Sequence, residues 1–168
     1  PPLVLTSQEL ITSADVFSIE FSDMKQRYRV LYGPDPLREL QVPMTHHREL
    51  LEYELREKLF LLRQHLMLAG TDEKQLWEIM LHSLSSFTTL FRHVLVEMGE
   101  RERKHSREAV AVLSKKLSFD DLPFLQLMDV RAKQSDRGRL RSSEVAAKYL
   151  DAITTVASAV DAMPGAHA

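Results

Sequence analysis

The chain contains no cysteine among its 168 residues, which excludes disulfide bonds, thiolate metal sites and a cysteine nucleophile. It also lacks any apolar run of the roughly 18 residues that a membrane-spanning helix needs. The net charge is only −2, so no overall field attracts nucleic acid or an anionic membrane surface. The 44% hydrophobic and 27% charged fractions are typical of a globular domain. We therefore expect a soluble, cytoplasmic protein with no membrane partner.

The stretch VFSIEFSDMKQRYRVLYGPDPL, residues 16–37, is the part of the chain that reads as β-strand. Phe17, Ile19 and Phe21 alternate with polar residues, which predicts a strand over residues 16–22. A second strand is predicted over residues 28–32, before the turn signal Gly-Pro-Asp-Pro. Two isolated strands do not form a stable sheet. We therefore expect further residues to precede Pro1.

The rest of the chain has a helical period. A short helix over residues 7–13 is predicted by the capping-box spacing of Thr6 and Glu9. From Thr45 onward, apolar residues recur every three or four positions. This period predicts five helices, at residues 45–69, 72–98, 104–117, 120–130 and 143–162. The predicted fold is mainly α, an antiparallel bundle of about five helices with a short N-terminal β segment. The predicted domains are residues 1–37 and 38–168.

Five cations lie close together in the loop between the last two predicted helices: Arg131, Lys133, Arg137, Arg139 and Arg141. Such a cluster can bind a phosphate group, or it can be an ordinary solvated loop. No aromatic residue is interleaved with these cations, so base stacking on a nucleic acid is not indicated. The sequence therefore offers these five residues as candidates for phosphate or substrate binding.

Other chemistry-bearing patterns are weaker. Glu78 and His82 are four residues apart on a predicted helix, whereas helical di-metal sites use Glu and His three residues apart. No bundle metal site is predicted. Arg101 and His105 are separated by three residues, short of the four to six that a helical Arg-His ribonuclease motif has. The sequence has no Gly-x-Ser-x-Gly nucleophile motif.

Several segments together resemble a known family. The stretch VFSIEFSDMKQRYRVLYGPDPL resembles the end of the palm lobe in bacterial nucleotidyltransferase-like proteins of the polymerase-β superfamily. Three further segments resemble the helical, substrate-side domain that follows this lobe: LSSFTTLFRHVLVEMGE, REAVAVLSKKLSFDDLPFLQLMDVR and KYLDAITTVASAVDAM. The resemblance covers nearly the whole chain, although its motifs are packing motifs more than chemical ones.

The resemblance implies nucleotidyl transfer from a nucleoside triphosphate, with two Mg²⁺ ions held by carboxylates. Glu20, or in second place Asp23, stands where the family's third carboxylate belongs. The family's Gly-Ser pair and its Asp-x-Asp pair are both absent from this sequence. One carboxylate does not hold two metal ions, so we expect this chain alone to be inactive.

Two functions remain open from the sequence. In the first, the chain is the C-terminal, substrate-side helical part of a nucleotidyltransferase, partnered by an N-terminal catalytic lobe and a nucleotide. In the alternative, it is a non-catalytic helical-bundle interaction protein that self-associates, for example as a homodimer.

Overall fold

The computed structural model describes residues 4–26, 28–100 and 104–163, and it is mainly helical, as predicted. The chain divides into two compact units, Pro1–Leu50 (the N-terminal unit) and Leu51–Ala168 (the helical unit). The sequence-based division between residues 37 and 38 stays a prediction. No helix in the described part of the chain is long and apolar enough to cross a membrane.

The N-terminal unit contains two short helices, α1 (Ser7–Thr12) and α2 (Ser18–Gln26). The predicted capping box at the start of α1 is confirmed, because Thr6 and Glu9 each bond the other's backbone N–H. A small core forms from these helices and the segment that follows them: Leu10, Ala14, Phe21, Leu37 and Leu40, with Met24 and Val42 at its edge. The side chain of Lys25 donates a hydrogen bond to the carbonyl of Leu40. These contacts fold residues 34–42 back onto α2.

The strand predicted over residues 16–22 is wrong, because most of that segment belongs to α2. Phe17 and Phe21 are alternate members of a strand face, but they are also four residues apart and so share a helix face. In the structure their ring centroids are 6.0 Å apart, and the Phe21 N–H bonds the Phe17 carbonyl at 2.9 Å. Glu20 in the first turn and Lys25 in the last turn both suit the helix dipole. Seven residues were too few for the pattern to separate the two periods.

The second predicted strand, residues 28–32, is also absent. The segment has no regular secondary structure in the structure, and Tyr32 is 98% exposed. The predicted turn follows it, with Gly33 at a φ of 78°. The Asp35 carboxylate accepts hydrogen bonds from the Tyr28 hydroxyl at 2.6 Å and from the Leu37 N–H at 3.0 Å. The hydrogen bond between the Tyr28 hydroxyl and the Asp35 carboxylate raises the pKa of Tyr28 and lowers the pKa of Asp35. A loop closed by one side chain therefore replaces the expected sheet edge.

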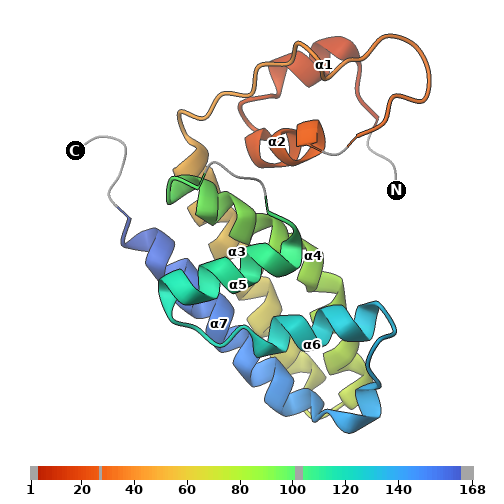
Figure 1. The fold of residues 1–168 in the computed structure, drawn as a ribbon, viewed down its shortest axis with the longest axis vertical. Helices are drawn as coiled ribbons and strands as arrows, with labels where there is room; N and C mark the ends of the chain where they lie inside the picture. Colours follow the sequence, from red (N-terminus) through yellow and green to blue (C-terminus); the bar gives the residue numbers. More distant parts are fainter. Residues whose placement is uncertain (1–3, 27, 101–103, 164–168) are drawn as a thin grey trace. The chain divides into compact units, whose positions relative to one another are not determined.

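In the described residues 51–100 and 104–163, the helical unit has five α-helices and one short 3₁₀ helix; Figure 1 shows their arrangement. Their bounds are α3 (His47–Ala69, which begins in the N-terminal unit), α4 (Glu73–Glu97), α5 (Ser106–Leu117), α6 (Leu122–Arg131), η1 (Arg137–Arg139) and α7 (Ser142–Asp161). These bounds lie within a few residues of the five helices predicted from the apolar period. Short interruptions come where the sequence places Gly70 and Gly99, both at positive φ.

Helix α4 is the centre of this unit. It contacts α5, α6 and α7, and Figure 1 shows α5 and α6 in front of α4 and α7. An aromatic cluster fills the space between these helices. Phe124 lies 5.0 Å from Phe91 and 4.7 Å from Tyr149, measured between ring centroids, and Phe87 meets Tyr149 edge-on at 6.0 Å. Phe87 and Phe91 are buried there.

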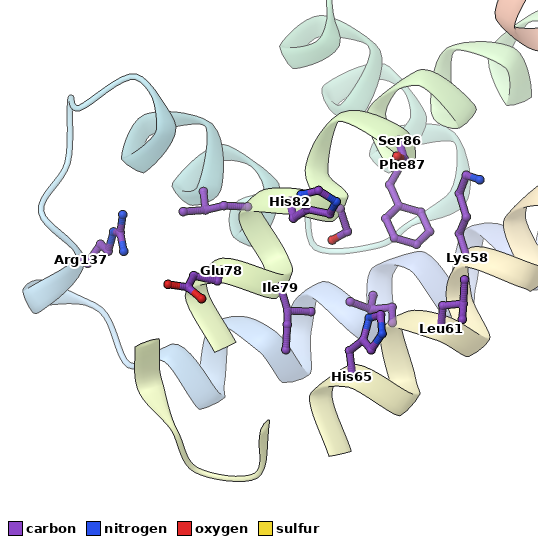
Figure 2. A pocket seen from close by; sticks show the side chains of 12 residues that line it. Lys58, Leu61, His65, Glu78, Ile79, His82, Ser86, Phe87 and Arg137 are labelled. Atoms are coloured by element: carbon purple, nitrogen blue, oxygen red, sulfur yellow. The ribbon is translucent and has the colours of Figure 1, made fainter. Parts of the chain in front are cut away.

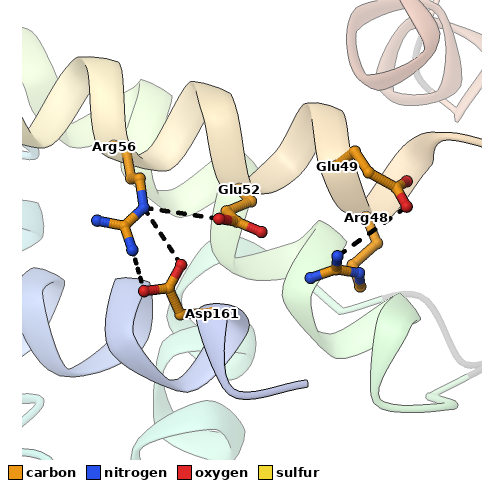
Figure 3. A network of polar contacts seen from close by, with 5 residues as sticks. All are labelled: Arg48, Glu49, Glu52, Arg56 and Asp161. Carbon is orange, nitrogen blue, oxygen red and sulfur yellow. Dashed lines mark hydrogen bonds and ion pairs between the residues drawn. The ribbon is translucent and has the colours of Figure 1, made fainter. Parts of the chain in front are cut away.

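Helix α3 joins the unit through its leucine face. Leu51, Leu55, Leu59 and Leu62 are buried, as the three-and-four spacing predicts. Arg56 pairs with Asp161 of α7 and lies 3.7 Å from Glu52, as Figure 3 shows. These contacts fix α3 against α7 at the surface as well as in the core.

Candidate anion-binding site

The basic segment between α6 and α7 does not act as one cluster. Arg131 is the last residue of α6, and its guanidinium donates to Ser85 Oγ at 2.9 Å and to the Leu81 carbonyl of α4. Lys133 follows in the left-handed region, at a φ of 58°, in the turn that ends α6. Its N–H and that of Gln134 bond the carbonyls of Val130 and Asp129 in the pattern of a helix C-cap. The guanidinium of Arg131 is therefore engaged by α4, whereas Lys133 contributes its backbone to the turn and its side chain is exposed.

The other three predicted cations lie around one hollow. Arg137 is the first residue of η1 and Arg139 is its last, and Arg141 is the residue before α7. The hollow has a volume of about 600 Å³ and lies between this segment and the start of α4. Its lining residues are Glu73, Lys74, Trp77, Arg137, Gly138, Arg139, Leu140 and Arg141. We call it the η1 hollow.

The local fold places these residues together for clear reasons. The Asp136 carboxylate accepts a hydrogen bond from the Gly138 N–H at 3.0 Å, which closes the turn of η1. On the other side, Asp72 caps α4 by accepting from the Gln75 N–H at 3.0 Å. Lys74 and Trp77 are three residues apart in the first turns of α4, so both reach the same side. Two capped turns therefore form the two walls of the hollow.

Basic side chains outnumber acidic ones in the lining of the hollow. No described residue forms an ion pair with Lys74, Arg137 or Arg139. Arg141 pairs with Glu144 at 3.0 Å, but both side chains are largely exposed, so this pair is weak. One acidic residue, Glu73, lines the hollow. The lining thus holds four cations and one carboxylate, while the carboxylates of Asp72, Asp136 and Glu144 lie in the adjoining turns and balance this charge. An anion would therefore be held by direct contact with the basic side chains and not by a net positive field.

A larger pocket lies between α3 and α4, with a volume of about 810 Å³ (Figure 2). Figure 2 shows Arg137 at one end of this pocket and Lys58 at the other. Its remaining lining residues are Leu61, Leu62, His65, Glu78, Ile79, Leu81, His82, Ser83, Ser86 and Phe87. Arg137 lines both this α3/α4 pocket and the η1 hollow. The two spaces therefore share a basic residue at their junction.

The floor of the α3/α4 pocket is tied to the core. Ser83 Oγ lies 3.1 Å from the hydroxyl of Tyr149 and donates to the Met80 carbonyl at 3.1 Å. Tyr149 is fully buried, and this burial raises the pKa of its hydroxyl far above the ordinary value, with the Ser83 hydrogen bond offsetting only part of the effect. Lys58 at the rim pairs with Glu54 at 2.5 Å. The pocket is thus apolar at its base and charged at both ends.

Glu20 lies on a helix and not on the predicted strand, and its assignment as a third carboxylate stays a prediction. It is an exposed residue in the first turn of α2, with Asp23 one turn later on the same helix. Within the described residues, no three His, Asp or Glu side chains are grouped so that they could hold a metal ion. The residues present therefore do not fit the pair of Mg²⁺ ions that the family resemblance implies.

The remaining candidates have structural places. His82 and Glu78 both line the α3/α4 pocket from α4. His105 is the N-cap residue of α5, while Arg101 lies outside the described residues. Trp77 is only 4% exposed and also lines the η1 hollow.

Sequence reasoning missed Lys74 as a partner of the basic segment. Lys74 and Arg137 are far apart in the chain, and only the packing of η1 against the start of α4 brings them together. The charge pattern of one segment does not predict which distant residues will lie next to it after folding. No known protein family matches the chain, and neither a curated protein nor a solved structure matches it.

Proposed function

We propose that this chain is the substrate-side helical module of a nucleotidyltransferase-like protein. In this proposal the helices of the helical unit form an antiparallel bundle that serves as one wall of the substrate cleft. The η1 hollow binds the phosphate groups of a nucleoside triphosphate, and the adjoining α3/α4 pocket receives an uncharged part of a substrate. The observation that carries the proposal is the convergence of Lys74, Arg137, Arg139 and Arg141 on one hollow.

The chemistry of the hollow suits phosphate. Arg137 and Arg139 carry planar guanidinium groups, which can bind phosphate oxygens with two parallel hydrogen bonds. Lys74 adds a compact charge from the opposite wall. Hydrogen bonds to charged groups contribute about 1.5–3 kcal/mol each, so loss of one such contact weakens binding by roughly tenfold or more.

The same proposal gives this chain no catalytic step. The metal ligands that nucleotidyl transfer requires would have to come from another lobe, because the described residues do not group carboxylates for them. We therefore expect triphosphate binding by this chain to be independent of Mg²⁺, and we expect no transfer activity from this chain alone.

The single tryptophan provides a direct test. Trp77 is the only tryptophan in the sequence and it lines the η1 hollow, so its fluorescence should change as triphosphate binds. The titration uses ATP and, separately, inorganic triphosphate, each with and without Mg²⁺. Arg137→Ala/Arg139→Ala should weaken binding by roughly tenfold to a hundredfold.

A matched control removes the same charge elsewhere. Arg107 pairs with Asp129 and Lys148 pairs with Asp120, both on the surface of the helical unit and away from the hollow. Arg107→Ala/Lys148→Ala should change the affinity by less than about threefold, because distant charges are screened by salt. Equal weakening by both double variants, or no fluorescence response at millimolar triphosphate, would refute the proposal.

The interaction-protein alternative keeps one supporting observation. Leu31 and Tyr32 in the N-terminal unit are 81% and 98% exposed and adjacent in the chain. Exposed apolar side chains of this kind are more typical of a contact surface than of a solvated loop. A mass that rises with concentration, together with no response to triphosphate, favours this alternative over the nucleotide-binding function.

A further inference from the structure

Helix α3 carries a second apolar stripe, on the side away from the core. Five large apolar residues of this helix are exposed: Tyr53 (61%), Phe60 (60%), Leu61 (46%), Met67 (83%) and Leu68 (77%). The buried leucines of α3 occupy the opposite side. We call the exposed set the outer stripe.

The spacing of the outer stripe is regular. Tyr53, Phe60 and Met67 are seven residues apart, as are Leu61 and Leu68. At about 100° per residue, all five fall within an arc of roughly 120°. A helix-pairing seam has apolar residues about every 3.5 positions. In the outer stripe, apolar residues at positions 53, 60 and 67 alternate with polar residues at 57 and 64, and Leu61 and Leu68 widen the stripe on one side. The outer stripe is therefore an apolar ridge with a polar residue in each turn between, on which a second helix can pack.

Exposed apolar residues are concentrated at this place. Elsewhere in the described part of the helical unit, the large apolar side chains that are exposed are Val96 and Leu122. These two lie singly, which is normal for a soluble surface. The clustering on α3 is therefore a property of this helix and not of the whole unit.

The charged residues near the outer stripe do not oppose its pairing with another helix. Arg56, at the edge of the stripe, is neutralised by Glu52 and Asp161 (Figure 3), and Lys58 is neutralised by Glu54. Within the arc itself, the polar residues are Glu57 and Gln64, seven residues apart. One carboxylate and one amide on the same stripe can complement each other between two helices.

We infer that the outer stripe pairs with the outer stripe of a second copy of this chain, with the two α3 helices antiparallel. A two-fold axis between residues 60 and 61 places Tyr53 opposite Leu68 of the second copy, and Phe60 opposite Leu61. The same axis places Glu57 opposite Gln64, where the amide donates to the carboxylate. Parallel pairing would instead oppose Glu57 with Glu57, which is repulsive.

The area is sufficient for a dimer of modest affinity. The exposed parts of the five side chains amount to roughly 600 Å² per copy, from aromatic side chains of about 150–250 Å² and aliphatic ones somewhat smaller. Pairing therefore buries roughly 1,200 Å² in total, which is the lower end of stable interfaces. Buried area alone does not fix the affinity, but interfaces of this size are typical of weak, transient complexes.

Sedimentation equilibrium of the whole chain tests the dimer. The wild-type mass should approach twice 19.3 kDa at about 100 μM. Phe60→Glu and Leu68→Glu should each be monomeric at that concentration, because they bury an unpaired carboxylate at the interface. Leu122→Glu is the matched control, since Leu122 is 45% exposed and lies outside the stripe. Far-UV circular dichroism checks that each variant remains folded.

The absence of cysteine allows a test of the register. Residues 57 and 64 lie about 10.5 Å apart along one helix, which is too far for a disulfide within the chain. Glu57→Cys/Gln64→Cys should form a covalent dimer on mild oxidation, and Glu57→Cys alone should not. Efficient cross-linking of the single variant would overturn the antiparallel arrangement.

The dimer does not involve the η1 hollow, although Leu61 of the outer stripe also lines the α3/α4 pocket, and either proposal can fail alone. A monomeric wild type at about 100 μM would overturn the dimer, whether the stripe is covered by another segment or left exposed. A dimer that survives both stripe substitutions would also overturn it, since the interface would then lie elsewhere.

Discussion

Tyr149 joins the core of the helical unit to the wall of the α3/α4 pocket, and its removal gives a test of that core. The ring packs against Phe124 and Phe87, and the hydroxyl lies 3.1 Å from Ser83 Oγ. Tyr149→Phe keeps the ring and removes only the hydroxyl. Ser83 retains its hydrogen bond to the Met80 carbonyl. At pH 7 the substitution should therefore lower the free energy of unfolding by about 1 kcal/mol, the net value of one hydrogen bond.

At high pH the difference should reverse. Burial raises the pKa of Tyr149 in the folded state, so the unfolded chain loses its tyrosine proton first, near pH 10. The unfolded state then binds fewer protons than the folded state, and the stability of the wild type falls as pH rises. This stability is fully present below pH 10 and decreases above it by about 1.4 kcal/mol per pH unit. Phenylalanine does not ionise, so the two stability curves should cross near pH 11.

Urea unfolding followed by Trp77 fluorescence, between pH 7 and pH 11.5, measures this crossing. Trp77 reports on the helical unit because it lies in α4 and is the only tryptophan in the sequence. Tyr32→Phe is the control, since Tyr32 is 98% exposed and its loss should leave the wild-type curve unchanged. Curves for wild type and Tyr149→Phe that stay parallel through pH 11.5 would show that the hydroxyl is not buried in solution, and the packing described for α4 and α7 would be wrong.

Substitutions at two further positions test the packing and the helix ends of the helical unit. Phe124 is fully buried between Phe91 and Tyr149, so Phe124→Ala should lower the free energy of unfolding by about 3–5 kcal/mol. Phe124→Leu should lower it clearly less. Equal losses for the two variants in urea titrations would contradict the tight packing. Ser118 ends α5 at φ 57° and ψ 45°, a conformation that glycine adopts without strain, so Ser118→Gly should raise the melting temperature of the helical unit by a few degrees, and a lower melting temperature would show that the cap is formed differently.

The apolar period identified the helices of the helical unit because each of them buries one face. In α4 and α7 the buried residues follow the three-and-four spacing without interruption. The same reasoning failed at residues 16–22, where Phe17 and Phe21 satisfy two periods at once. The apolar period also predicted only the buried face of α3. It did not predict the exposed second stripe, which includes Tyr53 and Phe60, because the buried leucines alone account for a helix. A helix that is apolar on two sides gives a weak net signal along the sequence.

The grouping of the basic residues was predicted in part, while their role in binding phosphate stays a prediction. The segment of residues 131–141 was singled out for its cations, and Arg137 and Arg139 do line a hollow. The sequence did not show that Arg131 is committed to α4, since this depends on where α6 ends in space. It did not show Lys74 either, for the same reason. Residue type and proximity in the chain are readable from a sequence, whereas the partner of a long side chain is set by tertiary packing.

The bonds of Arg131 to α4 have a consequence for residues 132–141. This loop is held at one end by that guanidinium and at the other by Ser142, which is only 2% exposed. Both ends are therefore fixed by folding, and the entropy of closing the loop is lost before any ligand arrives. If the η1 hollow binds triphosphate as proposed, binding restrains only the side chains of the loop, at about 0.5–1.5 kcal/mol for each one ordered. Arg131 would then act as an anchor that pre-organises its neighbours, and a change at this residue would weaken binding without a direct contact to the ligand.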